Sequence, residues 1–169
     1  MATKTTIDGA IIGIDNGING GLCAISASTG VVVDYTKMPV AERRGKDEVD
    51  TDGLLKWIKR FNPAATFIAI EEPLHFTKTL AAMRSMSVNF GLTIGFLRAH
   101  GYSIEPVQVR DWQSAMLGKF PRGKSKEVAL KKACQTWPNE HWLAGPRCKT
   151  PHDGIVDAAL IAAYTRASL

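Results

Sequence analysis

Cysteine is scarce in this chain of 169 residues, which contains three: Cys23, Cys134 and Cys148. The count is odd and no Cys-x-x-Cys pair occurs, so the sequence lacks both the pairing of a disulfide framework and the usual spacing of a zinc site. An uninterrupted apolar run of the ~18 residues that cross a membrane is also missing, and the first residues lack the apolar segment of a signal peptide. These absences favour a soluble protein of a reducing, cytoplasmic compartment.

Charge is unevenly distributed along the chain, although the net charge is only +5. Residues 1–107 hold equal numbers of acidic and basic side chains, whereas residues 108–150 hold nine basic and three acidic ones. A basic segment of this kind favours a polyanionic partner such as DNA. A solvated surface on a mildly basic protein is the alternative.

The stretch that organises the chain is residues 11–25. An apolar run ends there in Asp15, a turn rich in Gly and Asn follows, and a second apolar run begins at Leu22. The pattern predicts a β-hairpin whose first strand is buried on both faces. An ionised carboxylate at the end of such a strand needs a cation or several donors. Asp15 is therefore either a cap of its own turn or one member of a cluster of acids.

A second apolar strand is predicted over residues 66–71, and it too ends in an acid, Glu71. A helix starting at residue 51 or 52 precedes it, and a strand–helix–strand order implies parallel pairing with the first strand. Because parallel strands end at the same edge of a sheet, Asp15 and Glu71 are expected to be neighbours. Strand alternation directs Glu72 to the opposite face.

The other elements are expected in the following order. A third strand covers 30–36, and a charged connection without periodicity covers 39–50. A long helix over 77–100 carries apolar residues from Leu80 to Leu97 at helical spacing, and its small residues permit close packing on the sheet or on a second subunit. A strand over 102–107 and helices over 109–117 and 125–137 follow. The final helix is expected to open at Thr150, with Pro151 in its first turn.

The final helix contains Asp153 and Asp157, which share one helix face because they are four residues apart. Asp157 lies in an otherwise apolar stretch, whereas Asp153 has the alternative role of a capping box with Thr150. Asp15, Glu71, Asp153 and Asp157 cannot all ionise in one pocket unless divalent cations neutralise them. Carboxylates without His or Cys favour Mg²⁺ or Mn²⁺, and two such ions promote in-line displacement at phosphorus.

Three segments occur in order within residues 11–165: Gly13-Ile-Asp15-Asn-Gly, Ala69-Ile-Glu71 and His152-Asp153-Gly-Ile-Val-Asp157-Ala-Ala-Leu. Together they resemble the RuvC family of Holliday-junction resolvases, and most closely its short phage and organellar branch. The resemblance implies one α/β nuclease domain over residues 1–169, with a ribonuclease-H-like fold built on a mixed five-stranded sheet with helices on both faces. It further implies a homodimer that resolves four-way DNA junctions by paired symmetric nicks.

The resemblance also implies a catalytic set. Asp15, Glu71, Asp153 and Asp157 match the family's catalytic metal ligands, which hold two Mg²⁺ ions per site, with Mn²⁺ as a substitute. The last two acids are four apart here rather than three as in the bacterial enzymes, which leaves their individual roles open. Asn16 stands where the family usually has Pro. His152 is a metal ligand, a proton shuttle or a polar residue of the first helical turn.

Contacts with DNA are expected from two regions. Arg110, Lys124 and Lys126 match places where the family uses basic residues near the scissile phosphate, and lysines at a helix N-terminus form a phosphate site. Lys119 and Arg122 are expected to contact the backbone or to be solvated. A segment with Leu74 and Phe76 resembles the loop that inserts an apolar side chain into the junction; packing of Phe76 beneath the long helix is the alternative.

Other functions share parts of this pattern. A nuclease of the same fold that cuts other branched DNA or RNA/DNA hybrids would use the same acids. A non-catalytic junction-binding protein is a further alternative, although binding gains nothing from four mutually repelling carboxylates. A sugar-kinase-like ATPase also has a Gly-x-Asp-x-Gly hairpin, but it needs two such domains, for which the chain is too short.

Overall fold

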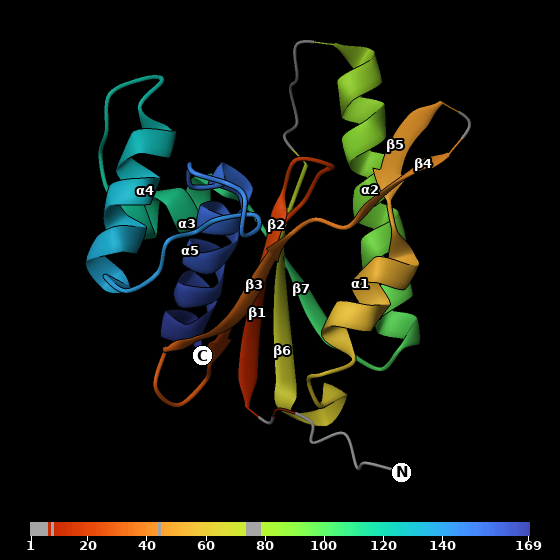
Figure 1. Cartoon of the computed structure of the whole chain (residues 1–169), viewed down its shortest axis with the longest axis horizontal. Coiled ribbons are helices and arrows are strands. Elements are labelled where there is room, and N and C mark those ends of the chain that lie inside the picture. The colour runs from red at the N-terminus through yellow and green to blue at the C-terminus, as the bar shows by residue number, and fades with distance from the viewer. Residues whose placement is uncertain (1–6, 8, 44, 74–78) are drawn as a thin grey trace.

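The computed structural model describes residues 7, 9–43, 45–73 and 79–169. Seven strands and five α-helices are found in them, together with a short 3-10 helix at Pro63–Ala65 (Figure 1). The strands are β1 (Ala10–Asp15), β2 (Gly21–Ser26), β3 (Val32–Lys37), β4 (Val40–Arg43), β5 (Lys46–Val49), β6 (Thr66–Glu71) and β7 (Ser103–Val107). The helices are α1 (Thr51–Ile58), α2 (Leu80–Ala99), α3 (Val109–Leu117), α4 (Ser125–Thr136) and α5 (Asp153–Ser168).

A mixed five-stranded sheet with the order β3-β2-β1-β6-β7 forms the centre of the fold. The strands β1, β2 and β3 form an antiparallel meander, while β6 pairs with β1 and with β7 in parallel. This arrangement confirms the hairpin, the third strand and the parallel pairing predicted from the sequence. It brings the carboxyl ends of β1 and β6 to the same edge of the sheet.

Helices cover both faces of this sheet, as Figure 1 shows with α3, α4 and α5 on one side and α1 and α2 on the other. Alternate residues of β1 enter the two cores: Ile11 packs with Trp112 and α5, and Ile12 packs with Leu54 and Leu97. This alternation follows from the two-residue period of a strand. It also determines which side chains at the sheet edge can meet α5.

The segment 39–50, which the sequence predicts as a charged connection without periodicity, contains a β-hairpin. Strands β4 and β5 pair antiparallel from Val40↔Val49 to Arg43↔Lys46, apart from the main sheet. Gly45 has a φ of 74°, the left-handed conformation that a tight turn needs and that glycine adopts without strain. Most of the hairpin side chains are exposed, so no apolar alternation marks these strands in the sequence.

The last helix begins later than predicted. Its first residue is Asp153 and its N-cap is His152, which makes no side-chain capping hydrogen bond. Pro151 therefore precedes the helix, and the capping box of Asp153 with Thr150 is wrong. The backbone N–H of His152 instead donates to the carbonyl oxygen of Trp142 at 2.8 Å, which anchors the start of α5 to the preceding loop.

Helix α2 packs on the sheet through little of its surface. Its buried residues are Asn89, Thr93 and Leu97, whereas Leu80, the first of the apolar residues at helical spacing, is 77% exposed. Among the described residues α2 is also the one helix long and apolar enough to cross a membrane, by length and composition alone. Core helices pass the same test, so this is weak evidence for a membrane span.

Candidate active site

Asp15 and Glu71 end two adjacent parallel strands. The register pairs Ile14 of β1 with Ile70 of β6, so the two acids that follow lie side by side at the sheet edge. Because side chains alternate, Asp15 lies on the same face as Ile11, and Glu71 lies on the same face as Ala69. Both Ile11 and Ala69 belong to the core beneath α5. The predicted pairing of these two acids is therefore present, on the α5 face.

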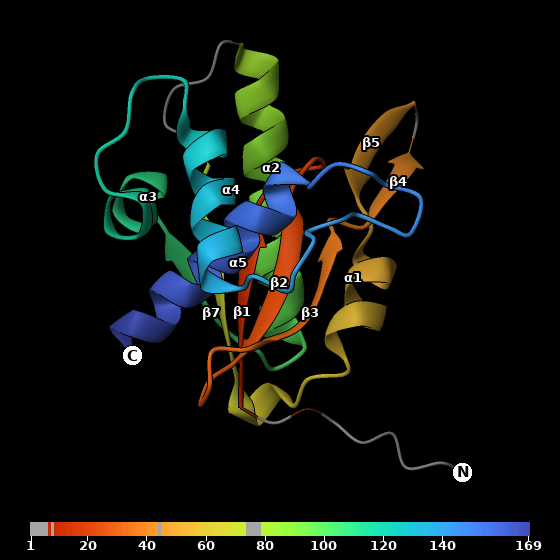
Figure 2. The same ribbon diagram turned by 60° about the vertical axis from the view of Figure 1, so that its left-hand side comes forward.

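Helix α5 approaches this edge unusually closely, because glycines face it. Gly20 forms an isolated bridge with Gly154 in the first turn of α5. A Cβ on Gly13 would lie 2.0 Å from the carbonyl oxygen of Ala158, and one on Gly21 would lie 2.7 Å from the carbonyl of Gly154. Figure 2 shows α5 lying across β1 and β2. This contact holds the start of α5, and with it Asp153, against the β1–β2 hairpin.

The electrostatics show that the four predicted acids share one region. Burial raises the pKa of Asp15 well above its usual value, and the charges of Glu71, Asp157 and Asp153 raise it further. Burial also raises the pKa of Asp157, to about 7, with further contributions from Glu71 and Asp153. The neighbouring acids thus make ionisation of Asp15 and Asp157 harder, which is the expected behaviour of carboxylates crowded into one site.

Two side chains make direct contacts with members of this cluster. Lys126, in the first turn of α4, forms an ion pair with Asp153 at 2.5 Å between Nζ and Oδ2. Its charge also lowers the pKa of Asp15 and of Asp157. The indole Nε1 of Trp112 donates to Oε2 of Glu71 at 2.8 Å. Burial raises the pKa of Glu71, and this hydrogen bond acts in the opposite direction.

The donor set suits hard divalent cations. Four carboxylates face one lysine that acts on three of them, so the cluster carries excess negative charge whenever its acids are ionised. Oxygen donors without thiolate or imidazole select Mg²⁺ or Mn²⁺. Within the described part of the chain, no group of three or more His, Cys, Asp or Glu side chains is in position to hold an ion as it stands. The chemistry of the donors therefore fits divalent ions, and their geometry requires adjustment of the side chains.

His152 lies beside this cluster at the N-cap of α5. Its pKa is lowered, mainly by burial, with contributions from Lys37 and Lys126, while Asp153 acts in the opposite direction. Its Nδ1 is buried and has no hydrogen-bond partner. These observations favour a neutral imidazole. Lys37, the last residue of β3, is a basic side chain near His152 that the sequence does not single out.

The other predicted DNA contacts are dispersed around the site. Arg110 is exposed on α3, and Lys119 and Arg122 are exposed in the loop between α3 and α4. Lys124 is the N-cap of α4 and pairs with Glu127 at 2.7 Å. Of the five predicted cations, Lys126 is the one that the structure joins directly to the acids. Leu74 and Phe76 lie outside the described residues.

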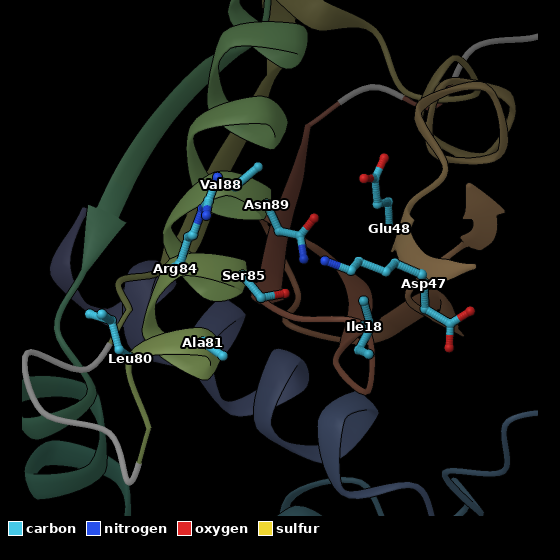
Figure 3. A pocket seen from close by; sticks show the side chains of 10 residues that line it. Ile18, Asp47, Glu48, Leu80, Ala81, Arg84, Ser85, Val88 and Asn89 are labelled. Carbon is cyan, nitrogen blue, oxygen red and sulfur yellow. The ribbon is translucent and has the colours of Figure 1, made fainter. Parts of the chain in front are cut away.

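Two further groups of residues remain apart from the cluster. Glu72 lines a separate cavity with Glu105 and Asp111, in keeping with the expectation that only Glu71 of the pair joins the other acids. A larger cavity of about 730 Å³ lies between α2, β5 and the β1–β2 turn. Figure 3 shows Ser85 and Asn89 of α2 facing Ile18 across it. None of the four acids lines either cavity.

Trp112 is the contact that sequence reasoning missed. The hydrogen bond joins residues 41 positions apart, from α3 to the end of β6, and nothing local in the sequence marks it. An isolated tryptophan in a short amphipathic helix indicates a core position, which Trp112 also occupies, since it is fully buried. Only the arrangement of α3 against β6 shows where its N–H points.

Comparison with known structures gives the fold. Thermus thermophilus RuvC in complex with a Holliday junction substrate matches with a TM-score of 0.61 and 14% sequence identity, over 94% of this chain and 94% of that one. A further Thermus thermophilus RuvC structure matches with a TM-score of 0.57 and 17% identity, over 94% and 96%. No family model and no curated protein matches the chain in sequence. At such identities the likeness is one of fold, and the chain has the ribonuclease-H-like fold of RuvC.

Proposed function

We propose that this protein is a metal-dependent endodeoxyribonuclease that resolves four-way DNA junctions by paired symmetric nicks. The proposal treats the chain as a single nuclease domain acting on DNA inside the cell. It also assigns the protein to the short phage and organellar branch of the RuvC family, because the segments around Asp15, Glu71 and Asp157 resemble that branch. The RuvC fold supports the general class, since one neighbour is a RuvC bound to a Holliday junction.

The observation that carries the proposal is the convergence of four acids from three elements. These acids are Asp15 at the end of β1, Glu71 at the end of β6, and Asp153 and Asp157 on α5. The charges of Glu71 and Asp153 raise the pKa of both Asp15 and Asp157, and the charge of Asp157 raises that of Asp15. A binding protein without catalytic activity gains nothing from this repulsion, which opposes folding. A site that takes up divalent cations turns the same repulsion into affinity.

Each residue has a distinct role in the proposed reaction. The four carboxylates would hold two divalent ions, Mg²⁺ or Mn²⁺, which supply Lewis-acid and water-activating chemistry when bound. Lys126, already directed at Asp153, is placed to contact the scissile phosphate once the acids are occupied. Arg110, Lys119, Arg122 and Lys124 are proposed to bind the DNA backbone around the site. His152 is proposed as a neutral polar residue at the start of α5.

The proposed enzyme is a homodimer, and α2 is the proposed interface. Leu80, Val88 and Leu92 are exposed on this helix, whereas polar Asn89 and Thr93 are buried beneath it. A helix with its apolar residues facing outward needs an apolar partner. A second copy of the chain can supply this partner, because a two-fold axis pairs the apolar face of α2 with the same face of the other copy. Two-fold symmetric pairing is also the commonest oligomeric arrangement. Two nicks in opposing strands also require two sites.

The test uses a synthetic four-way junction with Mg²⁺, and compares the wild-type protein with Asp15→Asn and Asp157→Asn. Both substitutions preserve shape while removing one negative charge. Symmetric nicks are expected from the wild-type protein, and both variants should lose cleavage by orders of magnitude while retaining junction binding. Binding is measured by gel shift in Ca²⁺ or EDTA.

Controls with a plain duplex, a flap and an RNA/DNA hybrid separate the proposal from its alternatives. Preferred cutting of a flap or a hybrid would indicate a different nuclease of the same fold. Cleavage that survives either substitution would show that these acids do not carry the chemistry. Junction binding by a wild-type protein that never cuts would leave the binding-protein alternative.

A further inference from the structure

Trp112 and Glu71 form the one hydrogen bond from a neutral side chain to the acid cluster among the contacts described. The indole Nε1 lies 2.8 Å from Oε2 of Glu71. Trp112 is fully buried, on α3, and packs in the same core as Ala69 of β6 and Ile155 of α5. Its ring is thereby fixed relative to β6 and α5, two of the three elements that supply the acids.

We infer that Trp112 is a positioning residue that holds the Glu71 carboxylate in its metal-binding orientation. An indole N–H is a donor only, so it bonds the carboxylate as an acceptor and leaves the second oxygen, Oε1, available. It is also uncharged and does not titrate. It therefore orients the acid without placing a cation where a metal ion would bind.

Lys126 also contacts the acid cluster, but as a charged donor, unlike Trp112. Its ammonium group pairs with Asp153 and carries a positive charge into the cluster, where it competes with a metal ion for the same oxygens. The hydrogen bond of Trp112 likewise favours the ionised carboxylate of Glu71, but it adds no charge that competes with a metal ion. This inference rests on the proposed function, and it assigns to α3 a role in the site besides its predicted DNA contact at Arg110.

Groups that hydrogen-bond to metal ligands change metal affinity or activity by about 10- to 100-fold when removed. Trp112→Phe removes the N–H while keeping an aromatic ring in the core. The chain offers a matched control in Trp142→Phe. Trp142 is also fully buried in the same core cluster, but its Nε1 has no hydrogen-bond partner among the described residues. The two variants lose similar volume, and only one loses a donor to the site.

The experiment measures Mn²⁺ binding to the full-length protein without DNA, by the electron paramagnetic resonance signal of free Mn²⁺. The dissociation constant is expected to rise about 10- to 100-fold in Trp112→Phe and to stay within about twofold of wild type in Trp142→Phe. With junction DNA and limiting Mn²⁺, Trp112→Phe should cleave more slowly and recover as Mn²⁺ is raised. Junction affinity in EDTA should not change.

If Trp112→Phe fails to fold, benzothienylalanine incorporated at position 112 replaces the N–H with sulfur and keeps the bicyclic shape; the same substitution at position 142 is its control. Equal Mn²⁺ affinity in the two variants, with wild-type protein that binds Mn²⁺ and cuts junctions, would overturn this inference alone. Wild-type protein that neither binds Mn²⁺ nor cuts junctions would overturn the proposed function and this inference together.

Discussion

The Asp157 carboxyl is held where ionisation is unfavourable. It lies in α5 among Val156, Ala158 and other buried residues, and its pKa is raised to about 7 by burial and by the charges of Glu71 and Asp153. In the unfolded chain the same carboxyl has its ordinary pKa of 3.8. Between these two values the folded protein binds a proton that the unfolded protein has released.

Stability without metal is therefore expected to fall as pH rises from about 4 to about 7. Each unit of pKa difference corresponds to about 1.4 kcal/mol, so the ionised carboxyl costs up to about 4 kcal/mol above pH 7. Asp157→Asn mimics the protonated acid. In EDTA at pH 8 it should be more stable than wild type, by urea denaturation, and the difference should vanish towards pH 4.

Added Mg²⁺ or Mn²⁺ should narrow the stability difference between Asp157→Asn and wild type at pH 8. The ions stabilise the ionised wild-type site and bind the variant less well. Asp34→Asn provides a comparison at an acid that has favourable partners, since Asp34 accepts hydrogen bonds from Arg60 and Trp57. Loss of this charge should make the protein less stable than wild type. A variant Asp157→Asn that is less stable than wild type in EDTA at pH 8 would contradict the assignment of Asp157 to a repulsive cluster.

At the level of secondary-structure elements, the site depends on the close contact between α5 and the β1–β2 hairpin. Gly13→Ala would place a methyl group 2.0 Å from the Ala158 carbonyl oxygen and 2.6 Å from the Ala162 nitrogen. Both are backbone atoms of α5, so the helix must move as a whole. We expect a loss of about 3 kcal/mol or more in unfolding free energy, at the upper end for overpacked cores.

Gly145→Ala provides the control for this prediction, since a Cβ on Gly145 meets nothing within 4 Å and its φ is not positive. Its stability should stay within about 0.5 kcal/mol of wild type. Thermal or urea denaturation measures both variants. If Gly13→Ala folds, its rate of junction cleavage should fall by more than the loss of folded protein accounts for. The reason is that Asp157 moves with the helix away from Asp15. Normal stability in Gly13→Ala would refute the close packing described here.

The elements that carry the acids could be predicted from the sequence because their signals are local. Apolar runs that end in Asp15 and Glu71 mark buried strands, and the strand–helix–strand order gives parallel pairing. The β4–β5 hairpin could not be predicted in this way, since its side chains are mostly exposed and leave no apolar alternation. The start of α5 was misplaced because Pro151 is equally compatible with the first helical turn and with the residues before it.

Contacts between distant elements were the least predictable part of the site. The four acids could be grouped because Asp15 and Glu71 end apolar strands, Asp157 lies in an apolar stretch, and Asp153 is one helical turn from Asp157. Trp112 was not anomalous, and the same residue type in the same kind of helix at Trp57 donates to Asp34 instead. Likewise, the apolar residues of α2 show helical spacing, but spacing does not say which side of a helix meets the sheet. The structure shows that Leu80 faces outward.

For the whole molecule, the outward apolar face of α2 predicts a dimer that one charge can disrupt. Val88 is 59% exposed on this face, and Val88→Glu would place a carboxylate inside the proposed interface. Val31 is the matched control, because it is also a valine, is 60% exposed, and lies before β3 in a cavity lined by Thr136 of α4 and Arg166 of α5. We expect wild type and Val31→Glu to be dimers by light scattering, and Val88→Glu to be a monomer.

Loss of the dimer should change the pattern of cleavage and spare the chemistry, because each acid cluster is built within one chain. Val88→Glu is therefore expected to bind Mn²⁺ with wild-type affinity and to nick junction strands singly. Paired nicks can be counted on a junction carried by a supercoiled cruciform plasmid, where simultaneous cuts give linear product and single nicks give relaxed circles. Wild-type protein should give linear product, and Val88→Glu relaxed circles. A monomeric wild-type protein, or a Val88→Glu variant that remains dimeric and still pairs its cuts, would rule out α2 as the interface.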